Sequence, residues 1–60
     1  GWGDKARAKA DKRAASLVRY FARDGRTLSV DDLADMVREG VGCGAKTARQ
    51  AAIRATEAQP

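Results

Sequence analysis

The chain has 60 residues, a formal net charge of +4 and an aromatic content of 5%. A domain near this size buries only about 60% of the surface that its unfolded chain exposes, so its core must be small and made of aliphatic side chains and alanines. Such a core leaves little room for a catalytic pocket, and the chain contains no histidine. We therefore expect a single domain that is not an enzyme and that holds no cofactor, metal ion or small-molecule substrate.

The charges are distributed unevenly along the sequence. Residues 1–24 hold seven basic and three acidic residues, residues 25–39 hold two and four, and residues 40–60 hold three and one, so the segment charges are +4, −2 and +2. A folded form would have a polarised surface, and a basic face favours a polyanion such as nucleic acid. An ordinary solvated surface would account for the same distribution.

The single cysteine, Cys43, cannot form a disulfide within the chain, so an oxidising compartment is not indicated. It also has no histidine partner with which to bind zinc or act as a nucleophile. No apolar run approaches the roughly 20 residues of a membrane span, and no signal peptide is visible. These features predict an intracellular protein of the cytoplasm or nucleoid that does not contact a membrane.

The first helix is predicted over residues 4–23, which are rich in good helix formers. Asp4 can cap its start, although Asp11 marks an alternative start that would leave residues 1–10 as a basic extension, helical or frayed, before a tri-helical domain over residues 11–58. Gly25 is placed for a left-handed C-terminal cap. The expected apolar stripe consists of Ala10, Ala14, Leu17, Val18 and Phe21.

The second helix is predicted from about Val30 to Glu39. Ser29 and Asp32 match the serine–x–x–acid form of a capping box, and Gly40 is expected to cap the other end. Its buried face should contain Val30, Leu33, Met36 and Val37, with Ala34 at the margin. The acidic residues of this helix are expected to form a solvated face without a catalytic role; they are Asp31, Asp32, Asp35 and Glu39.

The third helix is predicted to follow a turn over residues 42–44, to begin near Ala45 and to end near Thr56 or Ala58. Its apolar stripe consists only of alanines, which lets its backbone lie close to its neighbours; these are Ala48, Ala51, Ala52 and Ala55. The outward face should then carry Lys46, Gln50, Ile53 and Glu57, flanked by Arg49 and Arg54.

This outward face has the residue types that read DNA bases. Arginine and lysine can reach guanine O6 and N7, and glutamine can pair with adenine N6 and N7. The side chains expected to face bases are Lys46, Arg49, Gln50 and Ile53, with Thr47 and Arg54 at the edge for phosphates. Ile53 could contact a thymine methyl group, or it could pack on the segment around Trp2 or on a second subunit. Arg26, Thr27 and Ser29 lie at the start of the second helix, where a further phosphate contact is expected.

The arrangement resembles the helical part of helix-turn-helix and winged-helix DNA-binding domains. The residues that carry the resemblance are Gly25, Arg26, Leu28 to Ala34, and Thr47 to Gln50, within residues 13–54. The resemblance implies an all-α three-helix bundle that binds double-stranded DNA in a sequence-specific way through its third helix. It also implies a transcription regulator, replication initiator or recombination accessory factor of phage, plasmid or bacterial type. The turn is longer than in the compact motif, and no strand pair follows to make a wing.

Other interpretations remain open. Residues 42–48 resemble the hairpin of helix-hairpin-helix motifs, which bind the DNA backbone without sequence preference. Residues 40–47 differ by one residue from a phosphate-binding P-loop, with Ala45 where that motif needs glycine, and we interpret this as coincidence. The chain could instead be a protein–protein interaction module. A homodimer or a longer parent protein would extend the few base pairs that one small helix can read.

The first helix carries a further group of cations: Lys5, Arg7, Lys9, Lys12 and Arg13. These could follow the phosphate backbone of a duplex, adding affinity without sequence preference. They could also be solvated charges at a partly frayed helix start.

Overall fold

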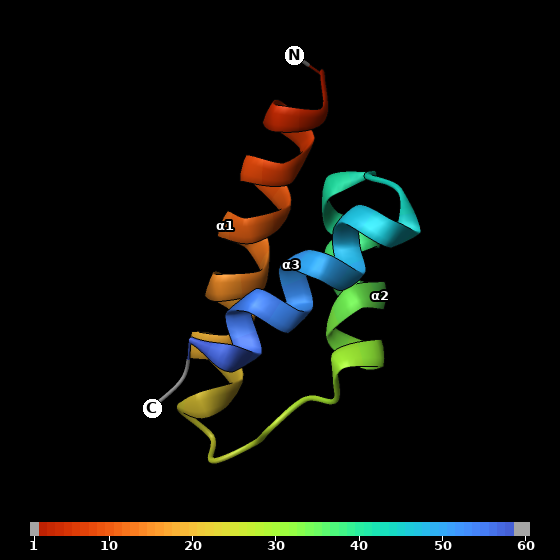
Figure 1. The fold of residues 1–60 in the computed structure, drawn as a ribbon. Coiled ribbons are helices and arrows are strands. Elements are labelled where there is room, and N and C mark those ends of the chain that lie inside the picture. Colours follow the sequence, from red (N-terminus) through yellow and green to blue (C-terminus); the bar gives the residue numbers. More distant parts are fainter. Residues whose placement is uncertain (1, 59–60) are drawn as a thin grey trace.

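The computed structural model describes residues 2–58, which form three α helices and the segments that connect them (Figure 1). The helices are α1 (Trp2–Ala22), α2 (Val30–Val41) and α3 (Ala45–Glu57). Each helix packs against the other two, and no strand occurs among these described residues. The predicted all-α three-helix bundle is confirmed.

α3 lies across both of the other helices. It begins beside the C-terminal end of α2, to which residues 42–44 connect it, and it ends beside the C-terminal end of α1 (Figure 1). The first turns of α1 extend beyond the other two helices, and residues 3–9 are exposed except for the half-buried Ala6. The N-terminal third of α1 therefore contributes little to the core.

α1 is a single helix that ends at the expected glycine. It is continuous through the residues that the sequence suggested as an extension, with no new start at Asp11. At its other end Gly25 has φ 70°. The Arg26 N–H donates to the carbonyl of Phe21 at 3.0 Å, and the Gly25 N–H donates to that of Ala22 at 3.0 Å. This pair of bonds is a Schellman motif, so the predicted cap at Gly25 is confirmed.

α2 begins where the capping pattern predicts. The hydroxyl oxygen of Ser29 accepts a hydrogen bond from the Asp32 N–H at 3.1 Å. Ser29 has the extended backbone conformation of an N-cap, φ −68° and ψ 158°. Because this bond satisfies one of the free N–H groups of the first turn, Ser29 has a structural role whether or not it also contacts a ligand.

The predicted end of α2 at Gly40 is wrong. The helix continues through Gly40 and Val41, and Gly42 forms the cap with φ 76° and an N–H bond to the Arg38 carbonyl at 2.8 Å. The continuation brings Val41 back onto the core. Gly40 instead lies against the side chain of Arg13 on α1, since a Cβ built on Gly40 would stand 2.9 Å from Nε of Arg13.

The core between the helices is small and consists mainly of alanines. Its buried members are Ala10, Ala14, Leu17, Leu33, Ala34, Val37, Ala48, Ala51 and Ala52. Among the described side chains, Leu33 and Val37 are the largest that are fully buried. The alanine stripe of α3 is confirmed. On α2, however, Ala34 is buried, whereas Val30 and Met36, expected inside, are only half buried, because α3 approaches the Ala34 side closely.

Within the described part of the chain, no helix combines the length and the apolar character that crossing a membrane requires.

Candidate nucleic-acid interface

The alanine seam of α3 determines which of its side chains face outward. With Ala48, Ala51 and Ala52 buried, helical periodicity places Lys46, Gln50, Ile53 and Glu57 on the opposite side. Lys46, Gln50 and Glu57 are exposed, and Ile53 is 37% exposed. We call Lys46, Gln50 and Ile53 the outward row. The predicted order of residues along this face is thus consistent with the backbone of α3.

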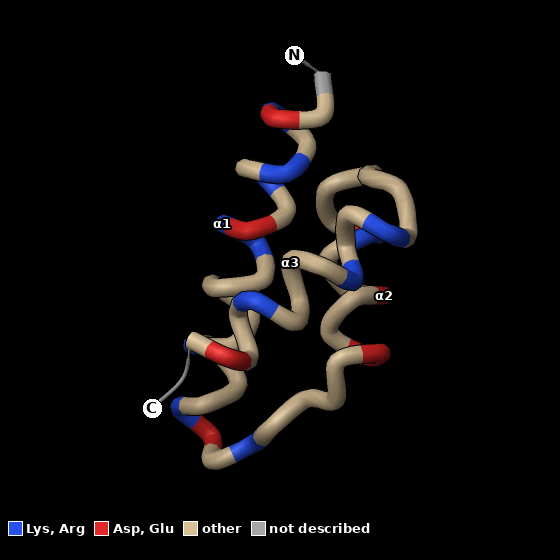
Figure 2. Tube along the Cα trace, in the orientation of Figure 1, with Lys and Arg blue, Asp and Glu red and all other residues tan. Residues whose placement is uncertain are grey.

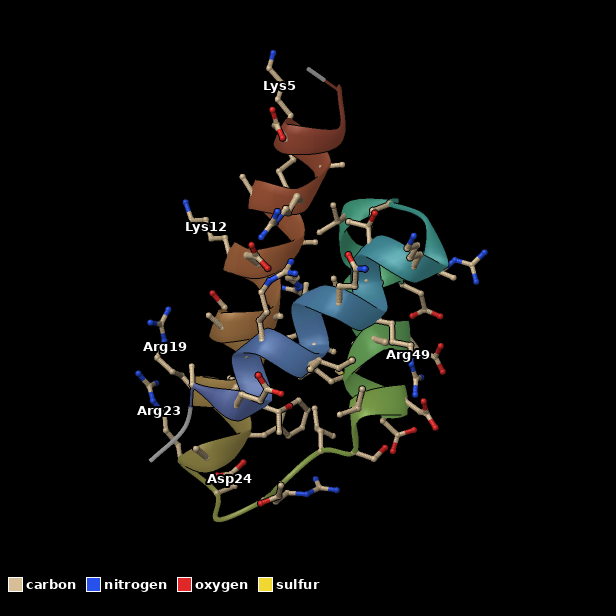
Figure 3. All side chains as sticks on the ribbon, in the orientation of Figure 1. Lys5, Lys12, Arg19, Arg23, Asp24 and Arg49 are labelled. Carbon is tan, nitrogen blue, oxygen red and sulfur yellow. The ribbon has the colours of Figure 1, made fainter. Side chains whose placement is uncertain are left out.

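Arg49 lies on the flank of α3 that faces α2 (Figure 3). Its Nη1 donates to Oδ1 of Asp31, the second residue of α2, and forms a salt bridge with it. The two side chains are 58% and 77% exposed. An ion pair this exposed contributes about 0–1 kcal/mol, so a phosphate or a base edge can replace Asp31 at little cost.

Arg54 lies on the other flank, which faces α1. Its Nε and Nη2 donate to Oδ1 of Asp11 at 3.0 and 2.7 Å. This pair is roughly 40% exposed and joins α3 to the middle of α1. Arg54 is therefore engaged in holding two helices together, a role that sequence analysis did not foresee. Thr47 occupies the same flank two turns earlier and is half buried.

Carboxylates of α2 lie next to one side of α3. A shallow groove there is lined by Asp31, Ala34, Asp35, Arg38, Ala45, Ala48 and Arg49. Acidic positions on α2 lie beside the basic start of α3 in Figure 2. Carboxylates repel phosphates, so a polyanion would be directed away from α2 and toward the outward row.

Arg26 and Thr27 are not close to Lys46. They line a small hollow together with Thr56, at the opposite end of α3. Arg26 also lies over the ring of Phe21, with Cζ 5.8 Å from the ring centroid. The connector 26–29 and the start of α3 therefore form two separate groups of candidate residues rather than one.

The glycine turn leaves the start of α3 without a side-chain cap. Gly44 is the N-cap, with φ −69° and ψ 160°, and no side chain bonds to the first turn. Among the described residues, the N–H groups of residues 45–47 have no hydrogen-bond partner. Cys43 is half buried against the core. α2, not a strand, precedes the turn, so the arrangement lacks the strand that a P-loop requires.

The cations of α1 divide differently from the sequence-based grouping. Lys5, Lys9 and Lys12 share a face with Arg19 and Arg23, whereas Arg7 and Arg13 lie on other sides of the helix. The sequence contains the signal for this shared face, because alternate steps of four and three residues lead from Lys5 to Arg23. No group of three or more potential metal ligands occurs within residues 2–58.

Comparison with protein-family models, curated proteins and solved structures gives no match. The resemblance to helix-turn-helix domains stays a prediction.

Proposed function

We propose that the chain binds double-stranded DNA by placing the outward row of α3 in the major groove. The observation that carries the proposal is the composition of this row, in which Lys46, Gln50 and Ile53 lie side by side above an alanine seam. A cation, an amide and an apolar side chain are the three kinds of group that distinguish base edges in that groove.

The row has a length suited to a short stretch of sequence. From Lys46 to Ile53 the helix advances about 10.5 Å, which corresponds to roughly three base pairs. One such helix reads too little sequence for a distinctive site. A pair of domains, formed by a homodimer or within a longer parent protein, would supply the rest.

The flanking residues have different roles in this proposal. Arg49 would exchange Asp31 for a phosphate or a guanine, because its surface salt bridge is weak. Arg54 would hold α3 against α1 through Asp11. Thr47 would contact a phosphate near the start of α3, and Arg26, Thr27 and Ser29 would contact one near its end.

A salt titration tests this function. Binding of the chain to a random duplex and to duplexes selected from a random pool is measured between 50 and 200 mM salt. Sequence-specific reading predicts steep salt dependence for both, with tighter binding to the selected sequences. Steep dependence without any preference would favour a hairpin that contacts only the backbone. No binding at low salt would contradict DNA binding altogether.

A protein–protein interaction module is the second candidate. It is favoured by the partial exposure of Ile53 between the exposed charged residues of α3, since an apolar side chain with a charged rim suits a protein partner. DNA binding by the unchanged chain distinguishes the two, because an interaction module would show none. If the chain binds, replacing Ile53 by Ala should weaken binding to the selected duplex only.

The biological setting that we propose follows the resemblance alone. It is that of a transcription regulator, replication initiator or recombination accessory factor, in which a small helical head recognises a site on the duplex.

A further inference from the structure

A line of five cations follows the outer side of α1. They are Lys5, Lys9, Lys12, Arg19 and Arg23, separated by steps of four, three, seven and four residues with Ser16 in the gap, so they share one helical face. Arg23 follows the last residue of α1, but its N–H still donates to the Arg19 carbonyl at 3.3 Å, which continues that face. All five are exposed. Lys5, Lys12, Arg19 and Arg23 point away from α2 and α3 in Figure 3. We call these five residues the outer ridge.

The outer ridge is not neutralised by the rest of the described chain. None of its five side chains forms an ion pair within residues 2–58. The acidic residues of α1, Asp4 and Asp11, lie about a third of a turn from it, and Asp11 is engaged by Arg54 on the bundle side. Asp24 lies beyond the end of α1, as Arg23 does, and it forms no salt bridge with the ridge within residues 2–58.

Helix stability does not account for the three lysines of this arrangement. Like charges three or four residues apart destabilise a helix by about 0.2–0.5 kcal/mol per pair. Two such pairs lie within α1, namely Lys5 with Lys9 and Lys9 with Lys12. Arg19 and Arg23, at the C-terminal end, suit the helix dipole, whereas the lysines nearer the N-terminal end do not. An external anion would remove the repulsion, which points to a charged partner.

The partner must be long and anionic. The ridge extends about 27 Å from Lys5 to Arg23, and a duplex offers one phosphate charge per about 1.7 Å of its axis. An acidic membrane fits less well, because a helix that lies on lipid inserts its apolar face. The apolar face of α1, with Ala10, Ala14 and Leu17, is buried in the bundle.

We propose that the outer ridge binds the phosphate backbone of a nucleic-acid duplex, at a surface separate from the outward row of α3. The Arg54–Asp11 pair lies between the two surfaces, on the flank of α3 that faces α1. Contacts of the ridge carry no sequence information, since the phosphates are the same at every step. This proposal does not depend on base reading by α3.

Two pairs of substitutions, matched in residue type and charge, test the proposal. The first pair, Arg19→Gln with Arg23→Gln, removes two cations from the outer ridge. The second pair, Arg7→Gln with Arg13→Gln, removes two exposed cations of the same helix that lie off the ridge and form no ion pair among the described residues. Circular dichroism confirms that each variant is folded. Binding of the full chain to a random duplex is then measured from 50 to 200 mM salt.

The ridge pair should reduce the slope of log Kobs against log salt by about 1.8, that is about 0.9 for each lost phosphate contact, and the second pair should leave it close to that of the unchanged chain. Equal reductions by both pairs would overturn the proposal, since net charge alone would then explain binding, and so would no reduction by either. Binding to phosphatidylserine vesicles without binding to the duplex would overturn it in favour of a membrane surface.

A third variant separates this proposal from that of base reading. Gln50→Ala should relax sequence preference at one base position while leaving the salt slope on the random duplex unchanged. If the unchanged chain shows no sequence preference but the ridge pair still reduces the salt slope, the proposal of base reading by α3 is wrong and that of phosphate binding by the outer ridge is supported.

Discussion

Asp11 and Arg54, 43 residues apart in the sequence, are joined by two hydrogen bonds from one guanidinium to one carboxylate oxygen, at 2.7 and 3.0 Å. The pair connects the middle of α1 to the last turn of α3. Because alanines make up the seam beneath it, few large side chains fix the position of α3, and this polar link contributes to that position.

We expect the Asp11–Arg54 pair to contribute about 0.5–1 kcal/mol, since its side chains are partly solvated. A double-mutant cycle of Asp11→Ala and Arg54→Ala, followed by thermal or urea unfolding, measures the coupling and cancels the change in helix propensity. The coupling should fall as salt is added. A coupling of zero at low salt would show that the link is incidental.

Two glycines near the end of α2 should respond to alanine in opposite ways. Gly42→Ala should destabilise the fold by about 1–2 kcal/mol, because φ 76° is strained for any residue with a Cβ. Gly40→Ala should stabilise it by about 0.5–1 kcal/mol through helix propensity, since the new Cβ meets only the flexible end of Arg13. Unfolding in urea checks both signs, and a destabilising Gly40→Ala would mean that Arg13 is held in place.

Gly44→Ser should add the cap that α3 lacks. The backbone of Gly44, φ −69° and ψ 160°, is nearly the same as that of the N-cap Ser29, φ −68° and ψ 158°. A serine there can accept from the Thr47 N–H and should stabilise the fold by a few tenths of a kcal/mol, since glycine is itself a tolerated N-cap.

The same variant separates two modes of DNA binding. If the free N–H groups at the start of α3 bind phosphate, as in a hairpin contact, the new hydroxyl competes for one of them and affinity falls as stability rises. If the outward row reads bases, affinity and preference are retained. Fluorescence anisotropy with the selected duplex, beside thermal unfolding, measures the two effects.

Asp31→Asn should strengthen DNA binding about two- to fivefold. The change frees Arg49 from a weak surface salt bridge and removes a carboxylate that repels phosphate. Asp32→Asn is the matched control, because it removes an equal charge from the same first turn of α2 without a bond to Arg49. Equal gains from both variants would contradict a specific role for the pair.

Gln50→Ala should relax preference at one base position at a cost of about 1–3 kcal/mol. Gln50 is exposed and has no hydrogen-bond partner among the described side chains, so the folded state should not change. Competition between duplexes that differ at single positions locates the effect. An unchanged preference profile would show that the outward row does not face the bases.

The sequence predicts those parts of the fold that depend on local signals. The Ser29 cap, the Gly25 cap and the alanine stripe of α3 each follow from a few neighbouring residues, and each is confirmed. The end of α2 does not depend on local signals alone. Gly40 and Gly42 are both suitable caps, and the packing of Val41 onto the core decides between them.

The candidate site could be predicted only as an order of residues along α3. The partners of Arg49 and Arg54 come from 18 and 43 residues away in the sequence, so no local pattern identifies them. The same limit applies to α1, where Arg13 covers Gly40. That contact separates Arg13 from the outer ridge although the two are close in the sequence.

The scarcity of large buried side chains has a further consequence. With Leu33 and Val37 as the largest fully buried residues in the described chain, the free protein should have only a few kcal/mol of stability, as small domains commonly do. A ligand at a hundred times its Kd adds about 2.7 kcal/mol, a large fraction of that total. We therefore expect unoccupied copies to be degraded much faster than occupied ones, so that the amount of this protein in a cell would follow the number of its binding sites.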